Sequence, residues 1–172
     1  MVKSGVHLLL AIAALGSGTS SLAASARQTS RYTKLTDCKI VEQGADEEDW
    51  LIHQCKGLGP IPVWIAYSDG NKAYVGFGHR RNVTGWFGID RNEKWPIEWR
   101  GRVQGGYFKP FAVIIRMPEM DAGSGSDLVV YRLRPDGASC IVGTTKSTND
   151  AARSIADGSM GEFTCARQPQ LP

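Results

Sequence analysis

IPVWIAYSDGNKAYVGF, residues 61–77, contains two apolar runs on either side of a tight polar turn. Gly70 and Asn71 within that turn accept positive φ, as a hairpin turn requires. Pro60 and Pro62 restrict the start of the first run to a strand beginning or an edge, because proline donates no backbone hydrogen bond. Both faces of residues 61–67 are largely apolar, so we expect this strand to be covered on both sides. The stretch therefore predicts a sandwich or a closed barrel.

Turn residues recur about every eight to twelve positions around this hairpin, which is typical of an all-β domain. We expect further strands over residues 38–43, 50–55, 97–102, 108–117, 128–134 and 138–144, with a short strand near Trp86-Phe87 inside a loop over 79–96. In the longest strand, alternation predicts one shared face for Phe111, Val113, Ile115 and Met117. The sequence predicts a mainly β fold, an antiparallel β-sandwich or small barrel of about seven to eight strands.

One short C-terminal helix completes the predicted fold. Ser147-Thr148-Asn149-Asp150 offers capping oxygens, and the small or apolar residues that follow at helical spacing are Ala151, Ala152, Ile155 and Ala156, until Gly158. A helix of this length would fray alone, so we expect tertiary packing to hold it.

The four cysteines of the chain are Cys38, Cys55, Cys140 and Cys165. They allow three pairings. An antiparallel ladder between residues 38–43 and 50–55, turning at Asp46-Glu47, would place Cys38 opposite Cys55 at a separation that a disulfide spans. The same register sets Val41 beside Ile52. We therefore expect a Cys38–Cys55 bridge.

The second expected bridge, Cys140–Cys165, would tie the segment after the helix to the last strand. With both bridges formed, no thiol remains for catalysis. No two cysteines lie at the close spacing of a zinc site, so we expect no metal.

Residues 1–26 have the three parts of a secretory signal. Lys3 gives a positive start, residues 8–15 an apolar core, and Ala24-Ser25-Ala26 a small-x-small cleavage pattern. The apolar core is too short to cross a hydrocarbon layer of roughly 30 Å. We expect cleavage before Arg27, no membrane span in the mature chain, and a periplasmic or secreted location, where disulfides persist.

The mature part is long enough for one domain. Residues 27–36 are polar and lack periodicity, which predicts a lead-in; residues 37–167 form a single disulfide-stapled β domain, and 168–172 a tail. The formal net charge of +3 includes Lys3, which leaves with the signal. This mild excess indicates no nucleic-acid surface. The sequence predicts no particular oligomeric state.

A resemblance to known proteins rests on four segments: Tyr32-Thr33-Lys34-Leu35-Thr36-Asp37-Cys38, Gln54-Cys55-Lys56-Gly57-Leu58-Gly59-Pro60-Ile61-Pro62-Val63, Ile97-Glu98-Trp99-Arg100 and Lys109-Pro110-Phe111-Ala112-Val113-Ile114-Ile115-Arg116. Together with the cysteine spacing, they resemble a family of small exported proteins of alphaproteobacteria that carries no assigned function. The resemblance covers nearly the whole mature chain. It implies a periplasmic or secreted setting and adds no mechanism.

Residues 55–73, which include Tyr67-Ser68-Asp69-Gly70-Asn71-Lys72-Ala73, are similar to the first hairpin of c-type lysozyme inhibitors, small β-barrels of the periplasm. Those inhibitors act through a loop of the Ser-Gly-x-x-Tyr type. Here Gly105-Gly106-Tyr107 lacks the serine and Gly158-Ser159-Met160-Gly161 lacks the tyrosine. No inhibitory residue is therefore carried over, and inhibition of a lytic enzyme stays an alternative.

The sequence offers little for catalysis and implies no cofactor. It has no Gly-x-Ser-x-Gly elbow, His-Glu-x-x-His pair or phosphate loop. His53 lies mid-strand, where a cross-strand partner such as Ile40 predicts a packed structural residue. A glycoside hydrolase needs two carboxylates across a cleft; Asp90, Glu93 and Glu98 are near each other in sequence, but nothing fixes them face to face. A carboxylate-based hydrolase is the second alternative.

Residues 86–108 interleave aromatic and basic side chains. Aromatic rings beside arginines suit sugars, peptides or anionic groups, through stacking, cation–π contact and forked hydrogen bonds. For Trp99, on a strand, a core position is the competing interpretation. The predicted binding residues are Trp86, Trp95, Trp99, Arg100 and Arg102. We therefore expect a non-enzymatic module that binds a cell-envelope glycan or a protein partner.

Overall fold

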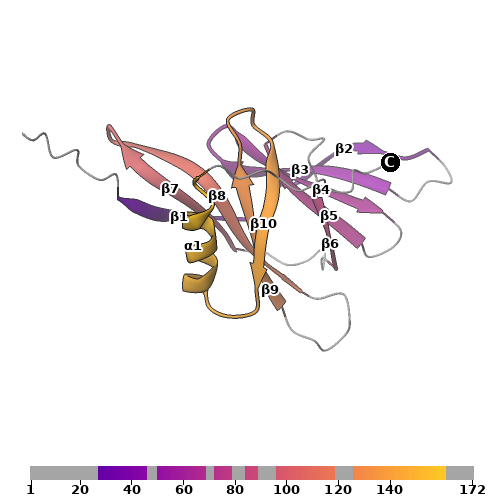
Figure 1. Ribbon diagram of the computed structural model, residues 1–172. Coiled ribbons are helices and arrows are strands. Elements are labelled where there is room, and N and C mark those ends of the chain that lie inside the picture. The colour runs from indigo at the N-terminus through magenta and orange to yellow at the C-terminus, as the bar shows by residue number, and fades with distance from the viewer. Residues whose placement is uncertain are drawn as a thin grey trace, which may run out of the picture.

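The computed structural model describes residues 27–45, 50–68, 72–78, 84–88, 96–118 and 126–161, with the backbone alone for 72, 84–88 and 118. Within these residues the chain is mainly β and forms ten strands and one helix. The strands make two five-stranded antiparallel sheets (Figure 1). The predicted signal, residues 1–26, lies outside the described residues.

The first sheet contains Gln28–Lys34 (β1), Pro96–Gln104 (β7), Tyr107–Pro118 (β8), Ser126–Leu133 (β9) and Ser139–Thr145 (β10), in the order β1-β7-β8-β9-β10. The second contains Lys39–Gln43 (β2), Trp50–Leu58 (β3), Ile61–Ser68 (β4), Lys72–Phe77 (β5) and Thr84–Gly88 (β6), in chain order. These ten described strands exceed the predicted seven to eight. Because they form two separate sheets, the sandwich alternative is confirmed over the barrel.

A single apolar core joins the facing sides of the two sheets. Phe77 of β5 meets Trp99 of β7 and Tyr131 of β9 edge-on, with ring centroids 5.7 and 5.0 Å apart. In β4, Ile65 faces this core while Ala66 is buried on the opposite face, so the predicted cover on both sides is confirmed. These contacts explain why the two sheets pack as one domain.

Helix α1, Asn149–Gly158, lies on the outer side of the first sheet (Figure 1). Thr148 is its N-cap, and its hydroxyl accepts a hydrogen bond from the Ala151 amide at 3.2 Å. Ala152 and Ala156 are fully buried against apolar side chains of β8 and β9. The predicted helix and its capping segment are therefore confirmed, and packing holds it in place.

The prediction of a polar lead-in over residues 27–36 is wrong for most of that segment, because Gln28–Lys34 is β1. It pairs with β7 along its full length. As an edge strand, β1 contributes polar rather than apolar contacts: the Thr33 hydroxyl accepts a hydrogen bond from the Trp99 indole at 2.8 Å. Such a strand has no apolar alternation for sequence analysis to detect.

The Cys38–Cys55 disulfide is confirmed. The register of its hairpin is only partly as predicted: Ile40 lies opposite His53, but a β-bulge places Glu42, not Val41, opposite Ile52. A bulge inserts one residue that has no partner across the ladder, so a register counted from the disulfide fails beyond it.

A second bulge corrects the predicted face of β8. Arg100 pairs with Ala112 and Gly101 with Pro110, which leaves Phe111 as the extra residue. Phe111 packs beside Ala112 on the helix side of the sheet, whereas Val113 faces the core. The predicted shared face is therefore right for Val113, Ile115 and Met117 and wrong for Phe111.

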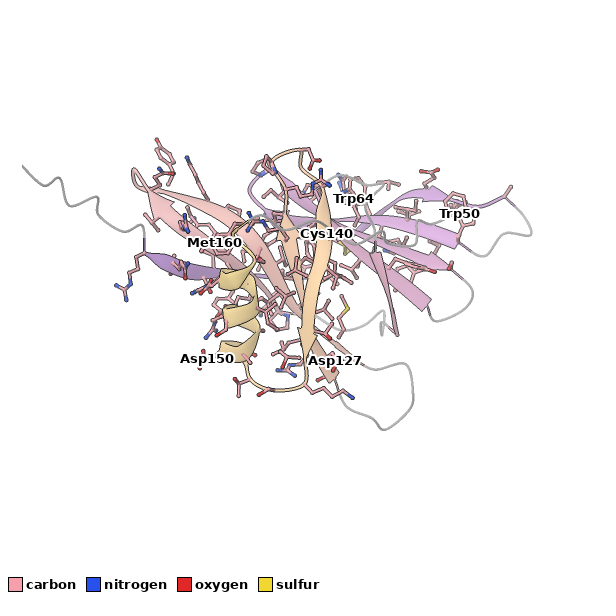
Figure 2. All side chains as sticks on the ribbon, viewed as in Figure 1. Trp50, Trp64, Asp127, Cys140, Asp150 and Met160 are labelled. Carbon is pink, nitrogen blue, oxygen red and sulfur yellow. A yellow bond between two sulfur atoms is a disulfide. The ribbon has the colours of Figure 1, made fainter. Side chains whose placement is uncertain are left out.

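The second predicted bridge falls partly outside the described residues. Cys140 of β10 is buried, near the centre of the molecule in Figure 2, and none of the described cysteines is free. Cys165 is not among the described residues, so the Cys140–Cys165 pairing stays a prediction.

Candidate functional site

The described members of the predicted aromatic–arginine surface do not lie on one surface. Trp99 is fully buried in the core between the sheets, so its predicted contact with a ligand is wrong. Arg100 and Arg102 lie on the opposite side of the sheet, because side chains alternate along β7. Trp86 is described only as backbone of β6, and Trp95 lies outside the described residues.

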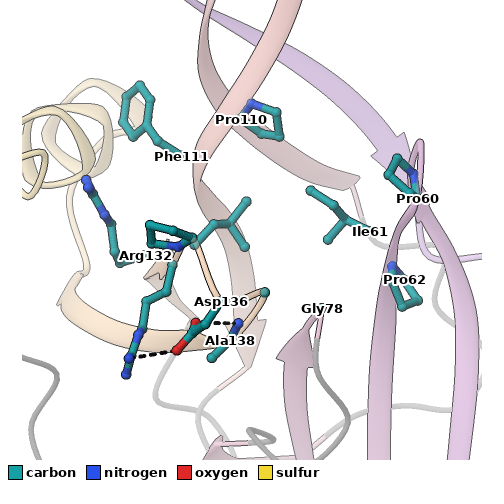
Figure 3. Close-up of a pocket in the computed structure, with 13 residues that line it drawn as sticks. Pro60, Ile61, Pro62, Gly78, Pro110, Phe111, Arg132, Asp136 and Ala138 are labelled. Atoms are coloured by element: carbon teal, nitrogen blue, oxygen red, sulfur yellow. Dashed lines mark hydrogen bonds and ion pairs between the residues drawn. The ribbon is translucent and has the colours of Figure 1, made fainter.

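A groove opens instead at one end of the sandwich, where the chain connections of the two sheets meet (Figure 3). We name it the proline groove, because four prolines line it: Pro60, Pro62, Pro110 and Pro135. Its volume is about 550 Å³. Proline donates no backbone hydrogen bond and has a fixed φ, so these walls are rigid and poor in donors.

Apolar side chains complete the walls. Ile61 comes from the start of β4, Phe111 from the bulge of β8, and Leu133 from the end of β9. The bulge gives Phe111 its place here, since regular alternation would have turned its ring into the core. The groove thus carries one partly buried aromatic ring among aliphatic and proline surfaces.

The floor of the groove is a close contact between the two sheets at Gly78 and Gly137. Gly78 has a φ of 83°, and a Cβ there would overlap the Gly137 carbonyl oxygen. The Gly78 amide donates to the Pro62 carbonyl at 3.1 Å, and its carbonyl accepts from the Trp64 indole. Glycine is required at this position because both the positive φ and the close approach exclude a side chain.

A buried hydrogen bond next to the floor fixes the spacing of the sheets. The backbone amide of Phe77 in β5 donates to the hydroxyl of Ser139 in β10 at 3.0 Å. Ser139 is only 3% exposed. The shape of the groove is therefore fixed by hydrogen bonds of the Phe77 and Gly78 amides, which do not depend on a bound partner.

The rim of the groove is charged. The Arg134 guanidinium forms an ion pair with Asp136 at 2.7 Å, and the second oxygen of Asp136 accepts from the Ala138 amide at 3.0 Å. Arg132 donates to the Ser159 carbonyl at 2.8 Å, just beyond α1. With two arginines and one aspartate, the described rim has one positive charge in excess.

Burial lowers the pKa of Arg132, and the neighbouring charge of Arg102 lowers it further. Arginine stays protonated at neutral pH despite such a shift. Arg132 is thus a partly buried cation, the kind of group that an incoming carboxylate or backbone carbonyl stabilises.

Glu98, one of the three acids considered for a hydrolase, is 4% exposed under α1. It accepts hydrogen bonds from Ser30 at 2.6 Å and from Arg153 at 2.6 Å. The hydrogen bond with Glu98 is the main cause that raises the pKa of Arg153. The positive charge of Arg153 balances the negative charge of this carboxylate, and the ion pair holds α1 on the sheet. Asp90 and Glu93 lie outside the described residues.

The described residues contain no group of three His, Cys, Asp or Glu side chains that could hold a metal ion. Among the described residues that line the proline groove, only Asp136 has a carboxylate side chain. The arrangement there suits recognition of a partner by shape, apolar contact and a single excess positive charge.

The proline groove was not predicted from the sequence. Its lining comes from turns and strand residues that are distant in sequence, and Phe111 reaches it only through a bulge. A usable signal was present: Pro60, Pro110 and Pro135 each stand beside a turn or a bulge, where rigid walls at a sandwich end can form.

No protein-family model, curated protein or solved structure matches this chain. The resemblances drawn from its sequence therefore stay predictions. In the described part of the chain, no helix has the length and apolar character needed to cross a membrane. The Cys38–Cys55 disulfide is consistent with an oxidising, extracytoplasmic location.

Proposed function

We propose that this protein is a non-enzymatic binding module of the periplasm or of the secreted fraction, and that the proline groove receives its partner. The observation that carries the proposal is the groove itself: rigid proline walls and the Phe111 ring stand above a floor fixed by Gly78 and Gly137. A preformed site loses little conformational freedom on binding, which favours affinity.

Between the two partner classes expected from the sequence, the lining favours a protein. Sugars are bound by exposed aromatic faces together with many hydrogen-bonding groups, whereas four prolines supply no backbone donor. Trp99, one of the tryptophans expected to stack on a glycan, is buried in the core. An extended polypeptide segment instead fills such a groove with apolar side chains and presents a carboxylate or carbonyl to Arg132.

Site-specific photo-crosslinking in the exported protein tests this proposal. A photoreactive phenylalanine replaces Ile61, which lines the groove, and in a matched variant replaces Tyr107, which is 76% exposed at the start of β8. We expect a discrete protein adduct from position 61 and none from position 107. Equal adducts at both positions, or none at position 61, would contradict the proposal.

The glycan alternative has its own measurement. A soluble peptidoglycan fragment is titrated into the purified protein, and intrinsic tryptophan fluorescence and backbone amide shifts are followed. Saturable shifts around Phe111 and Arg132 would replace the protein partner with a glycan. Their absence, together with the adduct at position 61, supports a protein partner.

Inhibition of a lytic enzyme is a special case of binding a protein. It predicts loss of c-type lysozyme activity when the purified protein is added in stoichiometric excess. Unchanged lysozyme activity removes this alternative, and the proposed binding role does not depend on it.

A further inference from the structure

A second hollow lies at the free edge of the first sheet, away from the proline groove. We name it the arginine hollow; its volume is about 600 Å³. Eight residues of β1, β7, α1 and the position before β1 line it: Arg27, Gln28, Thr29, Ser30, Tyr32, Arg100, Val103 and Arg153. No acidic side chain is among the described residues that line it. A concave surface of cationic and hydroxyl groups is suited to an anion.

Two of the three arginines that line the hollow, Arg100 and Arg153, form ion pairs with carboxylates. Arg100 makes a forked pair with Asp157, at 2.8 and 2.7 Å, and Arg153 binds Glu98 and Asp150. The hydrogen bond with Asp157 is the main cause that raises the pKa of Arg100. These pairs fix the guanidinium groups in place, so little side-chain freedom is lost when they contact a ligand.

The fixed groups still have donors directed away from their carboxylates. One terminal nitrogen of Arg100 has only a long contact, 3.4 Å, to the Ser30 hydroxyl. Tyr32 accepts a hydrogen bond from Arg153 at 2.9 Å, which leaves its own hydroxyl hydrogen for a further acceptor. Tyr32 is 57% exposed, so this donor is accessible.

Arg27 supplies a positive charge that no carboxylate of the described residues pairs with. It is exposed and has no ion pair within the described chain. Beside it, Gln28 donates to the sulfur of Met160 at 3.7 Å, just beyond the end of α1 in Figure 2. On β7, Arg102 pairs in register with Gln28 and likewise has no ion pair among the described residues. The open end of the hollow is therefore positive.

We propose that the arginine hollow binds a small molecule with a carboxylate or phosphate group, and that removal of the export signal completes the site. The inference rests on cleavage after Ala26, the cleavage point expected from the sequence, and is independent of the proline groove. Cleavage there makes Arg27 the first residue, so its new α-ammonium lies at the rim beside its own guanidinium. An α-amino group has a pKa of about 7.7–8.0, so it is mostly charged at neutral pH.

Titration with two anions tests the proposal. The mature protein, beginning at Arg27, is titrated with inorganic phosphate and separately with citrate at pH 6.5, with chloride used to keep the ionic strength constant. Backbone amide shifts are followed by NMR. We expect saturable shifts in β1 and β7 around Ser30 and Arg100, and none in β2; saturation by one anion alone identifies the preferred group.

Two matched comparisons locate the charge. Arg27→Gln removes a guanidinium from a residue that lines the hollow, whereas Arg31→Gln removes one from a residue that does not line it and lies 4.7 Å from the centre of the Phe108 ring. In a further variant Ser25-Ala26 remains attached, which moves the ammonium away from the rim. We expect roughly five- to tenfold weaker binding for Arg27→Gln and for the extended chain, because each loses one nearby charge. Arg31→Gln should bind as the mature protein does.

The proposal is overturned if neither anion gives saturable shifts at the hollow. It is also overturned if the extended chain and Arg27→Gln bind as tightly as the mature protein, or if the exported protein does not begin at Arg27 by mass spectrometry. Thermal unfolding of each variant without anion checks the fold, since no side-chain hydrogen bond or ion pair joins Arg27 to another of the described residues.

Discussion

The close contact between Gly78 and Gly137 can be tested because both glycines have a similar positive φ but differ in what a side chain would meet. Gly78 has a φ of 83° and Gly137 a φ of 79°. A Cβ on Gly137 would meet nothing within 4 Å, whereas a Cβ on Gly78 would overlap the Gly137 carbonyl. Substitution by alanine at both positions therefore separates backbone strain from steric overlap.

The magnitudes follow from these two causes. An L-residue in the left-handed region costs about 1–2 kcal/mol, so Gly137→Ala should lower the free energy of unfolding by that amount. Overlap with a packed neighbour costs typically about 1–3 kcal/mol more, so Gly78→Ala should lose about 2–5 kcal/mol. Urea denaturation followed by tryptophan fluorescence measures both variants. Equal losses would show that the sheets do not meet at Gly78 and would refute the described floor of the groove.

Three further predictions concern the core and the disulfide. The double variant Cys38→Ser, Cys55→Ser should lose roughly 3 kcal/mol in urea denaturation, because the bridge closes a loop with a sequence separation of 17 residues; an unchanged midpoint contradicts this. Ser139→Ala leaves the Phe77 amide buried without its acceptor and should lose about 1–3 kcal/mol, and a loss near zero would mean that the amide reaches water. Burial raises the pKa of Tyr131, so above about pH 10 the unfolded chain releases a proton that the folded chain retains. The free energy of unfolding should therefore fall as pH rises from 9 to 11. In Tyr131→Phe the share of this pH dependence that comes from Tyr131 should vanish.

Hydrophobic alternation and turn residues predicted most of the strands. The hairpin of β4 and β5 and the helix α1 came out with nearly the predicted bounds. These elements have a local cause, since apolar alternation in a hairpin and the cap at Thr148 act within a few positions. The Cys38–Cys55 pairing was predictable for the same reason, because one short hairpin brings the two residues together.

Bulges and polar edges were not predictable in this way. A bulge at Val41 or Phe111 shifts every later contact by one residue, and no composition signal precedes it. β1 is held by backbone pairing with β7, by the hydrogen bond from Ser30 to Glu98 of β7, and by the hydrogen bond from Arg153 of α1 to Tyr32. Those contacts join residues tens of positions apart, so periodicity along the chain does not record them.

The candidate site depends on these long-range effects. Trp99 was grouped with Arg100 because they are adjacent in sequence, yet adjacent residues of a strand point to opposite faces. Conversely, Ile61, Phe111 and Pro135 are far apart in sequence and line one groove. The groove was therefore beyond prediction until the register of both sheets was known.

The most direct test of the proposed function is the affinity of the partner captured at position 61 for two alanine variants. Phe111→Ala removes the aromatic ring of the groove, and Tyr107→Ala removes an exposed ring outside it. An aromatic anchor at an interface contributes more than about 1 kcal/mol, so Phe111→Ala should bind the purified partner at least roughly fivefold more weakly, while Tyr107→Ala binds as the unchanged protein does. A folded Phe111→Ala protein that binds with undiminished affinity would contradict the assignment of the proline groove as the binding site.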